Sequence, residues 1–156
     1  MASGSGTQQI DLNKLPLPQL AQLKQQLDQE LTVFHDSIQT LQMAKNKFGE
    51  SGDVLEKMTP DIKGKPMLVP LTSSMYVPGT IADVENVIID IGTGYYAKKD
   101  IESGKDYFKR RVEFVTEQME KISMLGAEKS KLREAVNALV EMKVQNELQA
   151  KKANSS

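Results

Sequence analysis

The sequence predicts a mainly α-helical protein with a small β portion. We expect a long antiparallel two-helix coiled coil whose helices are joined by two β-hairpins, which oligomerise into a β-barrel hub. Two observations lead to this expectation. Apolar residues recur every three or four positions in residues 10–58 and again in residues 104–152, a spacing that places them on one helix face. Between these segments, residues 60–103 hold four of the six prolines and many β-branched residues, which are typical of short strands and turns.

The composition limits the chemistry that the chain can perform. Its 156 residues correspond to one domain. A formal net charge of -1 lacks the basic excess of a nucleic-acid-binding domain. The lack of cysteine excludes disulfides and thiol catalysis and fits the cytosol or nucleus. No apolar run reaches the ~18 residues of a membrane span, and the first residues lack the apolar region of a signal peptide. We therefore expect no membrane and no nucleic acid among its partners.

The first helix is predicted within residues 10–58. Large apolar residues occupy six successive positions of one heptad phase: Leu20, Leu27, Phe34, Leu41, Phe48 and Leu55. Pro18 suits the first helical position, because its missing N–H has no helical partner there. Gly49 and Gly52 each disfavour a helix by about 1 kcal/mol relative to alanine. We therefore expect the helix to weaken near residue 50, with continuation through Leu55 and Met58 as the alternative.

The second helix is predicted over residues 100–150. Its apolar residues again step by three and four: Phe108, Val112, Val115, Met119 and Ile122. Asp100 or Ser103 is placed to cap its first turn, and Gly126 marks a possible bend. Because nothing else in the chain can cover two narrow apolar stripes of this length, the helices should pack on each other. A folded-back compact bundle is the alternative.

Two hairpins are predicted in residues 66–99. Thr72, Ser73 and Ser74 form a turn between two short strands, and Gly92-Thr93-Gly94 forms a tight turn between residues 87–91 and 95–98. Pro70 and Pro78 belong at strand edges or ends, because proline cannot donate to a β-ladder.

The side chains of these strands are too apolar for a free surface, and isolated hairpins are marginal in water. We therefore expect the strands to pair with strands of other chains, which protects their edges. An intramolecular four-stranded sheet packed on the helices is the alternative. The residues assigned to this oligomerisation hub are Leu68, Val69, Leu71, Met75, Tyr76, Val77, Val87, Ile88, Ile89, Ile91, Tyr95 and Tyr96.

We expect residues 10–152 to form one domain, between a disordered N-terminus at 1–9 and a disordered tail at 153–156. No catalytic residue, metal site or cofactor is expected. His35 is the single histidine and lies beside the apolar stripe, so it lacks a partner histidine or cysteine. Asp83, Glu85 and Asp90 are interpreted as turn and edge residues. Gly92-Thr93-Gly94 lacks the lysine of a phosphate-binding loop, and the basic run at 109–111 is interpreted as a solvated helix face.

The hairpin sequences carry a specific resemblance. Residues 68–79, Leu-Val-Pro-Leu-Thr-Ser-Ser-Met-Tyr-Val-Pro-Gly, and residues 90–96, Asp-Ile-Gly-Thr-Gly-Tyr-Tyr, resemble the α-type subunits of prefoldin, in particular the eukaryotic subunit-five type. The likeness extends to residues 20–30 and 106–111 and covers roughly residues 10–145. The resemblance implies a hexamer of two α-type and four β-type subunits. Its hairpins build a double β-barrel from which six coiled coils extend around a cavity.

The resemblance also implies an ATP-independent co-chaperone. Its coil tips would hold non-native actin and tubulin and pass them to the cytosolic group II chaperonin. Because both helices should leave the hub in the same direction, the chain's two ends should meet at the tip, where some apolar side chains should be exposed to clients. Ordinary packing at the end of a coil is the alternative. The assigned client-binding residues are Leu15, Leu17, Leu20, Leu23, Leu139, Val140, Met142, Val144 and Leu148.

We thus expect a prefoldin subunit that works in the cytoplasm, with other prefoldin subunits, clients and the chaperonin as partners. The sequence leaves a further role in the nucleus open. One alternative is a coiled-coil scaffold or transcription-regulatory protein that acts outside the hexamer. An enzyme is the third hypothesis, and the lack of a convergent catalytic group argues against it.

Overall fold

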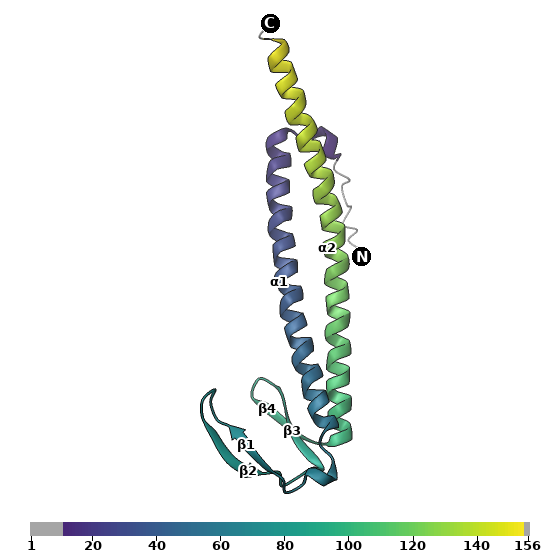
Figure 1. Cartoon of the computed structure of the whole chain (residues 1–156). Coiled ribbons are helices and arrows are strands. Elements are labelled where there is room, and N and C mark those ends of the chain that lie inside the picture. Colours follow the sequence, from purple (N-terminus) through teal and green to yellow (C-terminus); the bar gives the residue numbers. More distant parts are fainter. Residues whose placement is uncertain (1–10, 155–156) are drawn as a thin grey trace, which may run out of the picture. The chain divides into compact units, whose positions relative to one another are not determined.

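A computed structural model of the chain describes residues 11–154. Along the chain, one long helix is followed by two β-hairpins and then by a second long helix (Figure 1), as the sequence predicts. The elements are a 3-10 turn η1 (Leu12–Lys14), helix α1 (Leu17–Glu56), a 3-10 turn η2 (Pro60–Ile62), strands β1 (Pro66–Pro70), β2 (Tyr76–Thr80), β3 (Asn86–Gly92) and β4 (Tyr95–Asp100), and helix α2 (Ile101–Ala153). The disorder predicted for residues 1–9 lies outside the described residues, and the predicted tail is helical up to Ala153.

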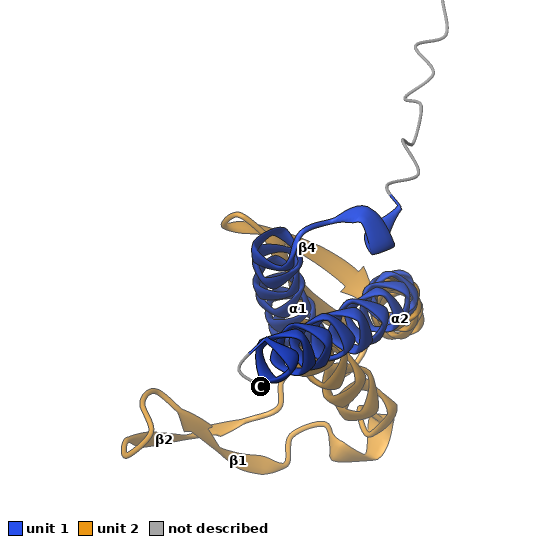
Figure 2. Ribbon diagram, turned by 90° about the horizontal axis from the view of Figure 1, so that it is seen from above, with its two compact units in different colours: residues 1–38, 120–156 blue, residues 39–119 orange. Residues whose placement is uncertain are grey.

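The chain divides into two compact units, coloured separately in Figure 2. Unit 1 comprises residues 1–38 and 120–156, and unit 2 comprises residues 39–119. Each unit therefore contains a segment of α1 and a segment of α2, and unit 2 also contains both hairpins.

The helices run antiparallel within each unit, as predicted. In unit 1, Glu30 pairs with Lys129 at 2.5 Å and Asp28 pairs with Arg133, so falling numbers in α1 face rising numbers in α2. Leu20, Leu27 and Val136 are buried between the two segments. In unit 2, Glu56 at the end of α1 lies 3.4 Å from Lys105 near the start of α2. The predicted heptad residues Leu20, Leu27 and Leu55 are thus buried.

Helix α1 continues without interruption through Gly49 and Gly52 to Glu56. The expected weakening near residue 50 therefore does not end the helix, and the alternative of continuation is confirmed for Leu55, whereas Met58 lies beyond the helix. The physical reason lies in the packing of unit 2. A Cβ atom at Gly52 would lie 3.6 Å from the Cβ of Phe108 in α2, and the rings of Phe48 and Phe108 are 6.5 Å apart. Apolar packing at this crossing outweighs the low helix propensity of two glycines.

Strand β4 leads directly into α2, and Asp100 caps the helix. Its carboxylate accepts the backbone N–H of Ser103 at 3.2 Å and the Ser103 hydroxyl at 2.6 Å. These bonds satisfy a donor that the first helical turn leaves open, and the Ser103 hydroxyl is the main cause that lowers the pKa of Asp100. Of the two predicted caps, the structure selects Asp100.

The hairpins form two separate two-stranded antiparallel sheets, β1–β2 and β3–β4, so the alternative of one intramolecular four-stranded sheet is wrong. The first turn lies at residues 71–75, where the N–H of Leu71 donates to the carbonyl of Met75 at 2.9 Å. The second turn has positive φ at Gly92 (104°), Thr93 (51°) and Gly94 (80°). Both predicted turns are therefore confirmed.

Two glycine substitutions should have opposite effects on stability. A Cβ at Gly49 has no neighbour within 4 Å, so Gly49→Ala should stabilise the chain by up to about 1 kcal/mol through helix propensity. A Cβ at the buried Gly104 would lie 3.0 Å from Leu55 and 3.3 Å from Val87. Gly104→Val should therefore destabilise it by about 1–3 kcal/mol through overpacking. Urea unfolding monitored by circular dichroism measures both, and equal effects at the two sites would contradict this packing.

Candidate functional site

The first hairpin, β1–β2, is apolar on both faces. Residues that face each other across an antiparallel pair share a face, and neighbours along a strand alternate. Val69 lies opposite Val77 on one face, whereas Pro70 lies opposite Tyr76 on the other. Every residue of β1 is exposed. The chain's own helices therefore cover neither face of this hairpin.

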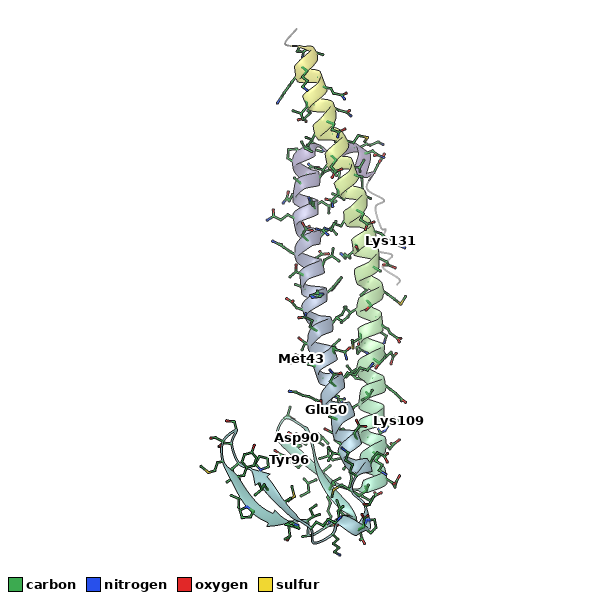
Figure 3. The ribbon with its side chains drawn as sticks, in the orientation of Figure 1. Met43, Glu50, Asp90, Tyr96, Lys109 and Lys131 are labelled. Atoms are coloured by element: carbon green, nitrogen blue, oxygen red, sulfur yellow. The ribbon has the colours of Figure 1, made fainter. Side chains whose placement is uncertain are left out.

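The second hairpin, β3–β4, has one face that is buried against its own chain and one face that is exposed. Ile89 is only 5% exposed, and a Cβ at Gly104 of α2 would meet the ends of both Ile89 and Val87 within 3.5 Å. The preceding residue, Ile88, lies on the opposite face of the strand and is 72% exposed. Asp90 and Tyr96, labelled in Figure 3, lie opposite each other in the register, and both are exposed.

This division corrects part of the predicted hub. Ile89 is covered by its own chain and Val87 is half-buried beside it. The side chain of Ile89 lies buried next to Gly104 of α2, so it is not part of the exposed surface of the chain. The alternation along β3 assigns the outward face to Ile88 instead.

The remaining predicted hub residues are all exposed, and together we call them the ribbon surface. They are Leu68, Val69, Leu71, Met75, Tyr76, Val77, Ile88, Ile91, Tyr95 and Tyr96, and Met67 joins them. Large exposed apolar side chains gathered on two short ribbons mark a protein interaction site rather than an ordinary surface. Their open strand edges can accept further strands.

The acidic residues near the hairpins support turns. The Asp83 carboxylate accepts the backbone N–H groups of Glu85 at 2.8 Å and Asn86 at 3.1 Å, and these two bonds are the main reason that its pKa is lowered. Asp90 accepts the N–H of Gly92 at 2.9 Å. Within residues 11–154, no three histidine, cysteine, aspartate or glutamate residues gather into a possible metal site.

The basic run at 109–111 does not form a uniform patch. Arg110 pairs with Asp106 at 2.8 Å. The Arg111 guanidinium lies 5.1 Å from the ring centre of Phe48 and 5.5 Å from that of Phe114, distances at which a cation is attracted to an aromatic face. Arg111 therefore contributes to packing in unit 2, and the interpretation of the run as a fully solvated face does not apply to it.

Along the described helices, no stretch is apolar enough to cross a bilayer.

A second apolar group lies in unit 1. Leu20, Leu27 and Val136 are buried, and Leu12, Leu15, Leu23, Leu139 and Val140 pack against them; we call these eight residues the end cluster. Leu20 of α1 is fully buried together with Leu27 and Val136, so its side chain is not exposed to a client. The other predicted tip residues keep part of their surface open. Leu15, Leu17, Leu23, Leu139 and Val140 are half-buried, and Met142, Val144 and Leu148 are exposed.

Sequence reasoning missed Lys143. Its ammonium donates to the backbone carbonyls of Asn13 at 3.0 Å and Leu15 at 2.5 Å. Asn13 lies 130 positions away and Leu15 lies 128 positions away, and a main-chain carbonyl leaves no trace in the amino-acid sequence. The one available signal is the position of a charged residue between the apolar residues Met142 and Val144.

Comparison with known proteins gives a consistent result. Residues 27–150 match the sequence model of the prefoldin family, described as prefoldin subunit. The chain is 48% identical over 138 residues to prefoldin subunit 5 of Homo sapiens, a match that covers 88% of this chain and 90% of the relative. It is 47% identical over 137 residues to the probable prefoldin subunit 5 of Drosophila melanogaster, which covers 88% of this chain and 82% of that one.

Among solved structures, the chain is similar to one from the cryo-EM structure of filamentous PFD from Methanocaldococcus jannaschii. The TM-score is 0.68 at 17% sequence identity, and the match covers 76% of this chain and 98% of the other. This likeness concerns the fold.

Adjacent isoleucines on β3 provide a matched test of the ribbon surface. Ile88→Lys should leave the isolated chain folded but abolish its assembly with other chains, because the outward face loses its apolar contact. Ile89→Lys should destabilise unit 2 by about 3 kcal/mol or more, because it buries an unpaired charge. Urea unfolding and gel filtration separate the two effects. Normal assembly of the Ile88→Lys chain would show that this face is not an interface.

Proposed function

The chain belongs to the prefoldin family and is a prefoldin chaperone subunit, and we propose that it acts as an α-type subunit of a hetero-hexameric prefoldin complex. The observation that carries this proposal is the ribbon surface. Two separate hairpins expose apolar side chains and open strand edges, and strands from other prefoldin subunits would cover both. The hairpins would then form a shared β-barrel hub.

The substrates under this proposal are non-native polypeptides, notably actin and tubulin chains. An unfolded chain offers apolar side chains that the native fold buries. Helix α2 carries three exposed apolar residues near its end, namely Met142, Val144 and Leu148. Methionine adapts its shape to varied partners. Each such contact is weak, so holding requires several subunits that act on one client at once.

Delivery to the cytosolic group II chaperonin completes the proposed role. The complex would hold a client without ATP and without chemical catalysis and release it to the chaperonin. We place this activity in the cytoplasm. Co-expression with other prefoldin subunits and native mass spectrometry test the assembly. A defined hexamer that contains the chain supports the proposal, whereas a chain that acts as a free monomer or dimer supports the alternative of a coiled-coil regulator.

Client capture is tested by two exposed residues of α2. Met142→Ser with Leu148→Ser should leave the complex assembled but weaken the suppression of actin aggregation, because α2 then offers less apolar surface. Light scattering of unfolded actin diluted into the assembled complex measures the effect.

The matched control changes the same residue types elsewhere on α2 in unit 1. Met124→Ser with Leu125→Ser also removes two exposed apolar side chains and should leave suppression unchanged. Equal suppression by the two double variants and the unmodified complex would remove the end of α2 from the client-binding surface.

A further inference from the structure

The segment that precedes α1 folds back as a short strap, residues 11–16, which crosses to α2 within unit 1 (Figure 1). Its 3-10 turn is closed by two bonds, from the N–H of Lys14 to the carbonyl of Asp11 and from the N–H of Leu15 to the carbonyl of Leu12. Asp11 caps the turn by accepting the N–H of Asn13 at 3.2 Å. Two leucines three positions apart, Leu12 and Leu15, pack against the buried residues of the end cluster.

Proline keeps the strap out of the helix. Pro16 follows Leu15, which is extended with ψ at 134°, as expected for a residue that precedes proline. The carbonyl of Pro16 accepts the first helical N–H groups, those of Gln19 and Leu20. The chain must therefore turn away from the axis of α1 at Leu15, and the strap is held by side-chain contacts and by Lys143 rather than by the helix.

Lys143 forms hydrogen bonds with the main chain of the strap. The strap's own turn uses the carbonyls of Asp11 and Leu12, and the ammonium of Lys143 takes those of Asn13 and Leu15. Charge-assisted bonds of this kind are stronger than neutral ones. Because every peptide carries carbonyl groups, this recognition does not depend on the side chains of the bound segment. Specificity comes from the two leucines.

We propose that this part of unit 1 is a binding groove for an unfolded segment with the pattern Leu-x-x-Leu, and that the strap occupies it as a built-in competitor. Lys143 is the residue that reads the main chain of the bound segment. The proposal rests on the proposed function and deepens it: a client occupies the groove by displacing residues 11–16, which uncovers the buried residues against which Leu12 and Leu15 pack, namely Leu20, Leu27 and Val136. In the free chain the strap covers this apolar surface and limits non-specific association.

A fluorescent peptide with the sequence of residues 11–18 tests the proposal on the full-length chain. Leu12→Ser with Leu15→Ser should release the strap and tighten peptide binding by roughly tenfold. In the unmodified chain the strap occupies the groove most of the time, and only the fraction of chains with an empty groove can bind the peptide. Both changed residues lie outside α1 and α2, and an unchanged helical circular dichroism signal verifies the fold. Equal peptide affinity of the variant and the unmodified chain would overturn the proposal.

Lys143→Met in this strap-released background should weaken peptide binding by roughly tenfold, the loss expected for a charge-assisted bond. Lys131→Met is the matched control, since Lys131 is an exposed lysine of α2 in the same unit and is labelled in Figure 3. It should leave the affinity unchanged. If both lysine variants bind the peptide equally well, Lys143 does not read the main chain.

Hydrogen exchange of the unmodified chain gives a measurement that needs no variant. The amides of Lys14 and Leu15, which donate within the strap, should exchange faster when the peptide is added. Unchanged exchange at a saturating peptide concentration would show that the peptide does not displace the strap and would overturn the proposal. The outcomes also separate this proposal from the proposed function. If the assembled complex suppresses actin aggregation but the peptide does not displace the strap, the proposed function stands and the groove proposal is wrong. If the assembled complex does not suppress aggregation, the proposed function is wrong.

Discussion

The architecture depends on one constraint: a two-stranded ribbon that is apolar on both faces cannot be stable alone in water. The first hairpin meets this condition, since Val69 and Val77 lie on one face, Pro70 and Tyr76 on the other, and all of β1 is exposed. Apolar area left in water costs about 25 cal/mol per Å², and open strand edges attract other strands. Under the proposed assembly, strands from other prefoldin subunits would remove both costs.

The second hairpin packs on a helix with one face and leaves its other face exposed. Its inner face lies on the start of α2, where Gly104 leaves room for Leu55, Val87 and Ile89, while its outer face carries Ile88 and Tyr96. Because β4 continues directly into α2 and Asp100 caps that helix, the hairpin and the helix form a continuous piece of unit 2. The residues that stabilise the single chain are thus distinct from those available to partners. One ribbon serves both purposes through the alternation of its side chains.

The sequence was sufficient for features with a local physical cause. The helical stripes follow from periodicity, and the hairpin at Thr93 follows from glycines that adopt positive φ. The chemistry of a first turn narrowed the cap of α2 to Asp100 or Ser103, and the structure selects Asp100. It failed where the outcome depends on distant contacts. Gly49 and Gly52 remain helical because packing near Phe108 outweighs propensity. Ile88 and Ile89 are identical in type, so only the structure shows which face β3 turns inward. Lys143 was missed because its partners are main-chain carbonyls at the other end of the sequence.

The most direct test of the central constraint is amide hydrogen exchange across residues 66–80, measured for the chain alone and for the chain assembled with other prefoldin subunits. The account predicts weak protection of β1 and β2 in the isolated chain and strong protection in the assembly, because foreign strands then bond to the open edges and exclude water from both faces. A monodisperse isolated monomer whose β1 and β2 amides are already as protected as those of the assembly would contradict it.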